Sequence, residues 1–380
     1  MDQSETSLKS NILLAPLDWG LGHATRSIPI IKTLLRHNAN VLIGAEGRIR
    51  TLLEKEFPQL EFVDLKGYDI SYSKNKWTLP FVLATQVPKI LSVIKYENER
   101  LAELVKAHAI NGVISDNRFG LYHENLPSVF ITHQLLIRTG LGKQANDFLQ
   151  NLNYSYINRF SECWIPDVKD SMNLSGELSH NDKEPAIPVK FIGPVSRFNY
   201  GPGVAKHILI LLSGPEPQRT ILEELILDQI SSIKTPVVLV RGMPGNTTGI
   251  NVPSHVSVFN HLPANELQQQ ITDASFVISR CGYSTVMDLA ISKKKSILIP
   301  TPGQTEQEYL ANHLQKINFA LCIDQQKFKI KNALDLASSF NYKPINLDFE
   351  NLLEEAVREL LGNVNRQSSS VNRGPEKEHK

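Results

Sequence analysis

The sequence contains little cysteine and no excess of charge of one sign. Its three cysteines, at positions 163, 281 and 322, form no CxxC pair. This argues against a disulfide framework and a structural zinc site, and it fits a reducing compartment. The 40 lysines and arginines balance 39 aspartates and glutamates. Since a nucleic-acid partner requires a basic surface, none is expected, and ligand recognition has to be local.

Long hydrophobic runs and several common catalytic motifs are also missing. No apolar run reaches the roughly 18 residues that a membrane-spanning helix needs, and the polar start MDQSETSLKSN lacks the apolar core of a secretion signal. We therefore expect a cytoplasmic protein. The absence of a Walker A loop, an HExxH motif and a GxSxG elbow argues against an ATPase, a zinc protease and an α/β-hydrolase. The absence of a DxD pair argues against a metal-chelated diphosphate.

Short apolar runs alternate with helical patterns along most of the chain. NILLAP and NVLIGA are the first such runs, and the rhythm resumes from HILILLS to FALCID. This alternation is typical of parallel βαβ units with helices on both faces of the sheet, and 380 residues allow two such α/β domains. A Pro- and Gly-rich connector places the boundary near Gly193, which gives domains 1–193 and 194–362. The polar segment 363–380 is predicted to be a disordered tail.

The motif GLGHATR follows the first predicted strand. Gly20 and Gly22 permit a tight turn and a close approach to a ligand. Thr25 stands where a dinucleotide fingerprint has its third glycine, so that fingerprint is not favoured and no cofactor is expected. His23 can take a proton from a sugar hydroxyl or a water because its ordinary pKa lies near neutrality. The alternative is a histidine that only bonds the helix start, and Arg26 either faces phosphate or is solvated.

A second strand-to-helix turn, in VISRCGYSTVMDLA, predicts a phosphate site. Arg280 can neutralise a diphosphate while N–H groups from Gly282 to Ser284 and Thr285 bind its oxygens. These groups can take the place of a metal cation, so we expect a metal-independent site. Asp288 lies about one helical turn further on, where its carboxylate can accept both ribose hydroxyls. The alternative is an acid that favours the helix dipole.

Two more polar segments of the second half can contact a ligand. The first follows HILILLS and is either an anion nest or an ordinary βα turn stiffened by prolines. The second, TPGQTEQEY, suits sugar hydroxyls, although the start of a surface helix is often acidic. The residues are Ser213, Gly214 and Arg219 in the first segment, and Gln304, Glu306, Gln307 and Glu308 in the second.

These segments resemble the GT-B glycosyltransferases, in particular the MurG-like group, which includes the peptidoglycan N-acetylglucosaminyltransferase and plant monogalactosyldiacylglycerol synthase. SRCGYSTVMDLA and IPTPGQTEQEYLAN resemble the donor-binding segment of that group, and GLGHATR resembles its glycine loop. The resemblance implies two Rossmann-like domains that face each other across a cleft. The second would hold the nucleotide sugar and the first the acceptor.

The resemblance also implies roles for single residues of the donor site. The turn from Arg280 to Thr285 falls on the phosphate-binding turn, and Asp288 falls on the ribose-binding acid, which is usually Glu. Gln307-Glu308 fall on the sugar-contacting pair, which is usually two glutamines. His261-Leu262 fall where the family grips the base through backbone groups.

On the first domain, SDNRFG ends a strand on the side of the implied cleft. Asp116 in this motif is a second candidate base, an orienter of His23, or only a helix cap. Arg118 can meet an anionic acceptor, and His133-Gln134 resemble a cleft-facing segment. The predicted acceptor-side residues are Gly20, Arg26, Arg118, His133 and Gln134.

Together these observations predict an inverting glycosyltransferase for a UDP-sugar, or a related nucleotide sugar, and an unidentified hydroxyl acceptor. His23 or Asp116 deprotonates the hydroxyl, which attacks the anomeric carbon while a nucleoside diphosphate leaves. A hexosyl or N-acetylhexosaminyl transfer in the synthesis of a cell-envelope polysaccharide or glycolipid is implied. The alternatives are a hydrolase, because some MurG-like enzymes with a GxGHxxR loop pass the sugar to water, and a non-catalytic nucleotide-sugar sensor.

The apolar segment 77–97 ends in basic residues. We predict a buried helix pair split by Pro88. The alternative is peripheral docking at the inner face of the membrane, as in MurG-like relatives.

Overall fold

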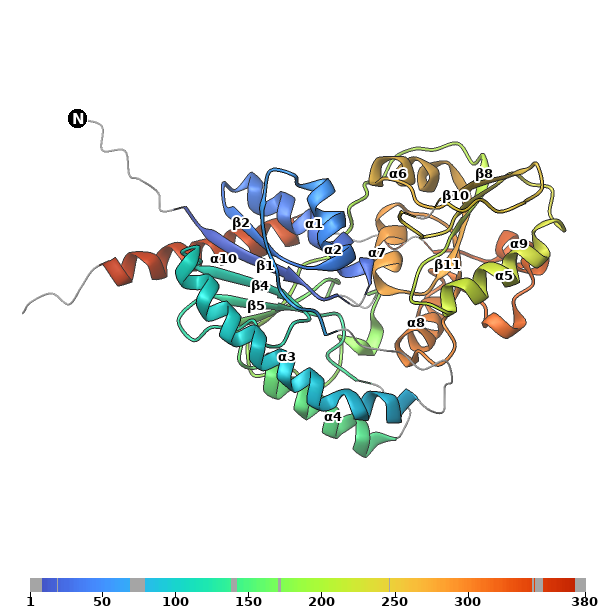
Figure 1. The fold of residues 1–380 in the computed structure, drawn as a ribbon. Helices are drawn as coiled ribbons and strands as arrows, with labels where there is room; N and C mark the ends of the chain where they lie inside the picture. The colour runs from blue at the N-terminus through green and yellow to red at the C-terminus, as the bar shows by residue number, and fades with distance from the viewer. Residues whose placement is uncertain are drawn as a thin grey trace, which may run out of the picture.

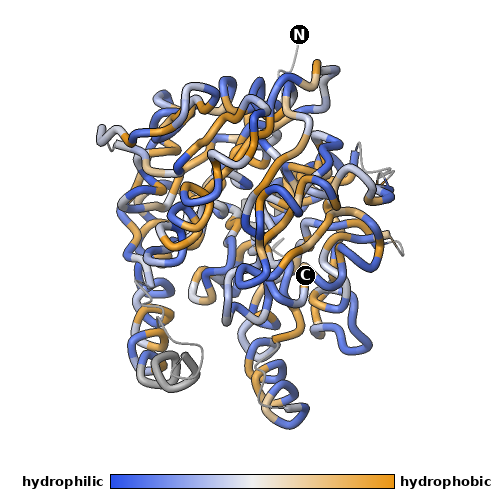
Figure 2. The backbone as a smooth tube through the Cα atoms, turned by 90° about the vertical axis from the view of Figure 1, so that its right-hand side faces the viewer, coloured by the Kyte–Doolittle hydropathy of each residue, from blue (hydrophilic) through white to orange (hydrophobic). Residues whose placement is uncertain are grey.

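A computed structural model describes residues 9–18, 20–68, 79–137, 142–169, 172–245, 247–343, 345 and 351–372 of the protein. Two parallel sheets lie side by side in it, each covered by helices (Figure 1). Figure 2 shows hydrophobic colour along the interior strands and mixed colour along the surface helices. Apolar side chains of the strands therefore form the cores, as the alternation of short apolar runs and helices predicts.

The first sheet has seven parallel strands in the order β3-β2-β1-β4-β5-β6-β7. The strands are β1 Asn11–Pro16, β2 Asn40–Gly44, β3 Glu61–Val63, β4 Gly112–Asp116, β5 Ser128–Ile131, β6 Glu162–Ile165 and β7 Val189–Phe191. The helical elements of this part are α1 Leu21–Arg36, α2 Gly47–Glu56, α3 Leu79–Ala107, α4 Lys143–Ile157 and the short η1 Gly176–Leu178. The strand order reverses direction between β1 and β4, and ligands of such sheets bind beyond the carboxyl ends of the strands at this point.

The second sheet has six parallel strands in the order β10-β9-β8-β11-β12-β13. The strands are β8 His207–Leu211, β9 Val237–Val240, β10 Val256–Phe259, β11 Ala274–Arg280, β12 Ser296–Ile299 and β13 Leu321–Cys322. The helical elements are α5 Gln218–Ile230, α6 Ala264–Asp273, α7 Tyr283–Ile291, α8 Thr305–Lys316, η2 Gln325–Lys327 and α9 Ile330–Ser339, and α10 Leu352–Asn372 follows them in the sequence. Here the order reverses between β8 and β11, so Arg280 ends a strand at the reversal. The predicted pair of Rossmann-like α/β units is confirmed, and the proposed boundary at 193 falls between β7 and β8.

The predicted disordered tail is wrong for residues 363–372, because α10 continues to Asn372. Val364 is fully buried, and the Asn365 side chain accepts a hydrogen bond of 3.0 Å from Ser10. The helix contacts α1 and β4, so α10 returns to the first sheet (Figure 1). Apolar residues continue at helical spacing from Val357 through Leu360 to Val364, and this periodicity outweighs the polar composition. Residues 373–380 of the predicted tail lie outside the described part.

The helix pair predicted around Pro88 is also wrong. From Leu79 onward the segment is one helix, α3, with Pro88 inside it, while residues 77 and 78 lie outside the described part. Val87 and Leu91 are exposed rather than buried. Among the described residues, no helix combines the length and hydrophobicity needed to cross a membrane.

Candidate functional site

The first turns of α1, α7 and α8 come together where the two sheets approach each other, a region we call the domain junction. A Cβ atom on Gly22 of α1 would lie only 2.8 Å from Ser284 Oγ of α7, so glycine permits this approach. Tyr283 of α7 stacks on His133 of the first domain, with ring centroids 4.2 Å apart. Glu306 of α8 pairs with His133 at 2.9 Å. Because helix amino termini carry partial positive charge, the junction favours an anion.

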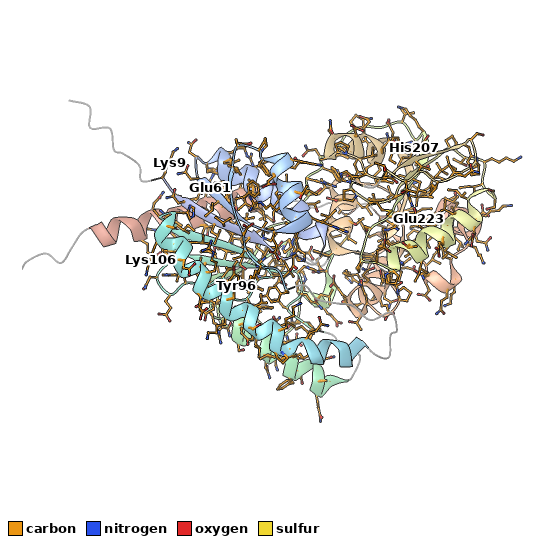
Figure 3. All side chains as sticks on the ribbon, viewed as in Figure 1. Lys9, Glu61, Tyr96, Lys106, His207 and Glu223 are labelled. Carbon is orange, nitrogen blue, oxygen red and sulfur yellow. The ribbon has the colours of Figure 1, made fainter. Side chains whose placement is uncertain are left out.

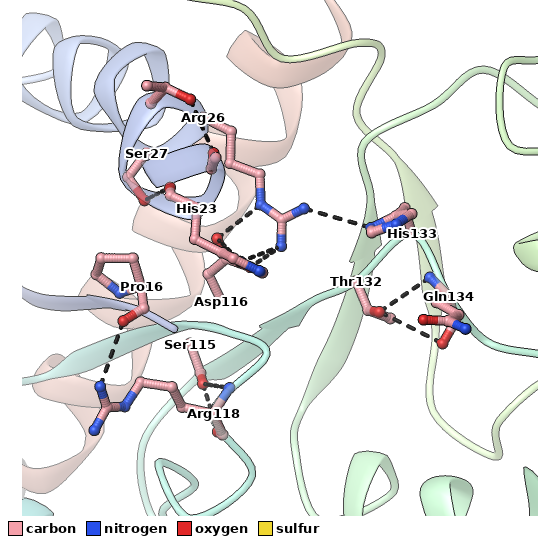
Figure 4. Close-up of polar contacts among 12 residues, drawn as sticks. Pro16, His23, Arg26, Ser27, Ser115, Asp116, Arg118, Thr132, His133 and Gln134 are labelled. Atoms are coloured by element: carbon pink, nitrogen blue, oxygen red, sulfur yellow. Dashed lines mark hydrogen bonds and ion pairs between the residues drawn. The ribbon is translucent and has the colours of Figure 1, made fainter. Parts of the chain in front are cut away.

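A buried polar cluster lies on the first-domain side of the junction (Figure 4). Asp116, at the end of β4, accepts a hydrogen bond of 2.7 Å from Arg26 Nε on Oδ2, and Arg26 Nη2 bonds its other oxygen. His23 Nδ1 lies 3.1 Å from Asp116 Oδ2 and 2.8 Å from Arg26 Nη2. Arg26 and Asp116 are almost fully buried, whereas 16% of the His23 side chain is exposed. The structure thus brings His23 and Arg26 of the motif GLGHATR together with Asp116 of the motif SDNRFG.

The charges of this cluster set its protonation. Burial alone would raise the pKa of Asp116, but the charge of Arg26 and the contact with His23 outweigh burial and hold that pKa below its usual range. Burial lowers the pKa of His23, Arg26 lowers it further, and Asp116 opposes both effects. At neutral pH the cluster therefore contains an ionised Asp116 whose two oxygens are both bonded, and a neutral His23 that can accept a proton.

Arg280 ends β11, just before the predicted phosphate turn, and is buried rather than at the surface. The residue is 2% exposed, and its guanidinium donates to the backbone carbonyls of Gln218 at 2.7 Å and Pro300 at 3.3 Å. Burial lowers the pKa of Arg280 to about 10. Its Nε has no hydrogen-bond partner among the described residues. Arg280 therefore ties the end of β12 to the start of α5, and a buried cation that has no carboxylate partner in the described part of the chain favours an anion nearby.

The rest of the predicted phosphate turn is open at its surface. Gly282 is the N-cap residue of α7, and a Cβ atom added there would meet no atom within 4 Å. Ser284 and Thr285 follow in the first turn and are half-buried. A ligand can therefore approach the N–H groups at this helix start, as the sequence predicts.

Asp288 lies further along α7, next to the connector between the sheets. It is half-buried and accepts a hydrogen bond of 2.5 Å from Ser196 Oγ. Burial raises the pKa of Asp288 to about 6, with Arg197 opposing the rise. Burial lowers the pKa of the His261 side chain, and Arg197 lowers it further, while Leu262 points into the core. The candidate ribose and base residues thus lie within the electrostatic reach of the same arginine.

Two arginines that were predicted to bind ligands form ion pairs within their own domains. Arg118 is 1% exposed, and its Nε donates to buried Glu97 at 2.8 Å, so it does not meet an acceptor as predicted. Arg219 donates to Glu216 at 2.6 Å and to Glu223, labelled on α5 in Figure 3, at 2.9 Å. Carboxylates therefore neutralise Arg219, and its predicted role at an anion nest is not supported.

The polar residues around α8 mainly hold their own loop. Gln307 Oε1 accepts from the Thr301 N–H at 2.9 Å, its amide group bonds the Gln304 side chain, and Glu308 accepts from the Gly303 N–H at 2.9 Å. The nearby Glu306 points instead to the first domain, as its pairing with His133 requires. In the sequence Glu306 is one of several polar residues of this loop, and no local pattern shows that it pairs across domains.

The remaining predicted residues lie at strand or helix ends. Gly20 is the N-cap residue of α1 and has a φ of 114°, a conformation that glycine adopts readily. Ser213 and Gly214 follow β8, and Gly214 is exposed. The Gln134 N–H donates to Thr132 Oγ1 at 3.0 Å. Among the described residues no cluster of three or more His, Cys, Asp or Glu side chains can hold a metal ion, and metal independence stays a prediction.

Comparison with known proteins finds chains that resemble this one in sequence and in fold. Residues 244–359 match the model of the glycosyltransferase family 28 C-terminal domain. Over 354 residues the chain is 20% identical to the UDP-N-acetylglucosamine–N-acetylmuramyl-(pentapeptide) pyrophosphoryl-undecaprenol N-acetylglucosamine transferase of Francisella philomiragia, covering 88% of each protein. The transferase of the same name from Bradyrhizobium diazoefficiens is 33% identical over 91 residues, which cover 23% of this chain and 24% of that protein.

Solved glycosyltransferases share the fold of the whole chain. A UDP-glucosyltransferase from Polygonum tinctorium aligns with a TM-score of 0.60 and 12% identity, covering 96% of this chain and 98% of the other. MurG of Acinetobacter baumannii aligns with a TM-score of 0.50 and 14% identity, covering 96% and 99%. The predictions of a GT-B fold, of a MurG-like relationship and of a nucleotide-sugar-dependent glycosyltransferase are confirmed.

Proposed function

We propose that this MurG-like glycosyltransferase moves a sugar from a UDP-sugar to a hydroxyl acceptor, with inversion at the anomeric carbon and without a metal ion. The observation that carries the proposal is the position of His23, bonded to Asp116, against the first turns of α7 and α8. A base on one domain and groups that attract a diphosphate on the other thus meet at the domain junction. Transfer with inversion needs the base and the leaving diphosphate on opposite sides of the anomeric carbon.

His23 is the better of the two candidate bases. Asp116 is 1% exposed and Arg26 bonds both of its oxygens, so an acceptor hydroxyl cannot reach its carboxylate. His23 is neutral at physiological pH and partly exposed. In the proposed step, His23 Nε2 takes the proton of the acceptor hydroxyl, whose oxygen forms a bond to the anomeric carbon. The bond from that carbon to the diphosphate breaks, and its electron pair leaves with UDP.

The leaving diphosphate is assigned to the open turn at the start of α7. The N–H groups from Gly282 to Thr285 would bind its oxygens, and the buried charge of Arg280 would favour the developing negative charge. Asp288 is assigned to the ribose, and the backbone at His261 and Leu262 to the base. We assign Gln304, Gln307 and Glu308 to the sugar, although all three bond groups of their own loop.

An acceptor for a cell-envelope polysaccharide or glycolipid fits two observations. The Francisella philomiragia relative is named for a pyrophosphoryl-undecaprenol acceptor. Two helices of the first domain also expose apolar pairs one turn apart, Val87 and Leu91 on α3 and Phe148 and Leu152 on α4, each at least 44% exposed. We propose that these helices contact the inner face of the membrane peripherally, where a lipid-linked acceptor is available.

The test measures UDP release and sugar transfer from a panel of UDP-sugars, with and without lipid-linked hydroxyl acceptors. We expect transfer that depends on the acceptor and falls roughly 100- to 10,000-fold in His23→Ala, the usual contribution of a general base. His37→Ala is the matched control, because it removes a histidine beyond the other end of α1. Stoichiometric release of free sugar without an acceptor would instead identify a hydrolase, and UDP-sugar binding without turnover would identify a sensor.

A further inference from the structure

A continuous chain of polar contacts connects the second domain to the candidate base. Glu306 Oε1, on α8, lies 2.9 Å from His133 Nε2. His133 Nδ1 lies 3.4 Å from Arg26 Nη1, and Arg26 Nη2 lies 2.8 Å from His23 Nδ1. Figure 4 shows the first-domain part of this chain, with Arg26 between the two histidines. A carboxylate of the donor-side domain is therefore two side chains away from His23.

The positions of the hydrogens in this series of contacts follow from which atoms can donate and which can only accept. A guanidinium can only donate, so His133 Nδ1 has to accept from Arg26. The hydrogen of a neutral His133 is then on Nε2, and it needs an acceptor, which is the Glu306 carboxylate. The ring of Tyr283, parallel to His133 within 2°, fixes the plane of the imidazole. Two residues of the second domain thus hold His133 in the orientation that receives Arg26.

His23 Nδ1 has two neighbours with opposite requirements. Arg26 Nη2 can only donate to this nitrogen, whereas Asp116 Oδ2 can only accept from it. If Nδ1 accepts from Arg26, the ring hydrogen is on Nε2, and Nε2 cannot take a proton from an acceptor. A base at Nε2 requires the hydrogen on Nδ1, bonded to Asp116, and this requires Arg26 to move away from Nδ1.

We propose that Glu306 is a positioning residue that sets the tautomer of His23. Held by Glu306 and Tyr283, His133 draws Arg26 toward itself and off His23 Nδ1, so the hydrogen moves to Nδ1 and Nε2 becomes free. In the competent state that we infer, the contact between His133 and Arg26 is shorter than the 3.4 Å of the structure, and the contact between Arg26 and His23 is longer than 2.8 Å. The base then becomes competent only when the donor-side domain is in place. This inference rests on the proposed function of His23.

The charged groups that face His23 come from four elements. They are Arg26 on α1, Asp116 at the end of β4, His133 after β5 and Glu306 on α8. Removal of the Glu306 carboxylate takes away a negative charge near His23 and leaves Arg26 on its Nδ1. Both effects disfavour protonation of His23. The acid limb of the pH–rate profile should therefore move to lower pH in Glu306→Ala, while the plateau falls.

The test compares Glu306→Ala and Glu306→Gln with wild type in kcat, KM for the donor and pH profile. For Glu306→Ala we expect a loss in kcat of roughly 10- to 100-fold, a part of the contribution of a general base, with little change in KM. Glu306→Gln should retain part of the activity, because its amide oxygen still accepts from His133 Nε2. Glu354→Ala is the matched control, since Glu354 also bonds a histidine, His37, at 2.5 Å but lies at the other end of α1.

A second readout does not need activity. Nitrogen-15 spectra of histidine-labelled protein with bound UDP report which nitrogen of His23 carries the hydrogen. We expect Nδ1–H in wild type and Nε2–H in Glu306→Ala. The same tautomer in both proteins would overturn the inference, as would a Glu306→Ala variant with wild-type kcat and pH profile. If His23→Ala keeps full activity, the proposed function fails instead, and the spectra still decide the tautomer.

Discussion

Replacement of Asp288 by asparagine should make the stability of the protein less sensitive to pH. The carboxyl group is half-buried beside Ser196, and burial raises its pKa to about 6 from an ordinary 3.8. A raised carboxyl pKa means that the folded state binds the proton more tightly than the unfolded state. Its contribution to stability is therefore complete below pH 3.8 and is lost as the pH rises through about 6.

The size of the effect follows from these two pKa values. The full difference corresponds to roughly 3 kcal/mol, at 1.36 kcal/mol for each factor of ten. Between pH 5 and pH 8 the wild type should lose about 1.4 kcal/mol of this amount, and Asp288→Asn should lose none of it. The amide oxygen can still accept the hydrogen bond from Ser196. Any other cost of the substitution is the same at both pH values and cancels in the comparison.

The assay is urea denaturation of both proteins at pH 5 and pH 8. We expect the free energy of unfolding of Asp288→Asn, relative to wild type, to be about 1.4 kcal/mol higher at pH 8 than at pH 5. Asp335→Asn, which removes an exposed carboxylate from α9 of the same half of the chain, is the control for the charge change. An equal difference at the two pH values would refute the argument that burial holds a proton on Asp288.

Three further substitutions test other parts of the structure. Arg118→Met should lower the free energy of unfolding by about 3–5 kcal/mol in urea denaturation, because it leaves buried Glu97 without its ion-pair partner; a loss below about 1 kcal/mol would contradict this. Val364→Ala should cost about 1.5–3 kcal/mol by the same measurement, and no cost would restore the prediction of a disordered tail. Gly22→Ala should change thermal stability little but reduce kcat up to about 100-fold, because the new methyl group separates α1 from Ser284; wild-type kcat would show that this approach is unimportant.

The sequence predicted those site residues that depend on strand ends. Asp116 and His23 lie 93 positions apart, yet both follow parallel strands near the reversal of strand order, where carboxyl ends meet. Arg118, two positions after Asp116, turns into the core because it pairs there with the buried carboxylate of Glu97 on α3. No local pattern reveals that partner, since α3 and the loop after β4 meet only in the folded chain.

Some features that differ from the predictions could have been predicted from sequence patterns. Glu216 and Glu223 lie three positions before and four positions after Arg219, a spacing that predicts ion pairs along one face of a helix start. The apolar periodicity of α10 likewise continued past residue 362. Glu306 is a different case, because its partner His133 is supplied by the other domain, and only the packing of the two domains could reveal the pair.

The path of α10 has a consequence for how the enzyme can open. The chain passes from the first sheet to the second through the connector before β8, and α10, which follows the second sheet in the sequence, packs again on α1 and β4 of the first half. The second sheet is therefore joined covalently to elements of the first half at both of its ends. Substrate entry and product release cannot separate the halves completely, so His23 on α1 and the start of α7 should meet again after each cycle.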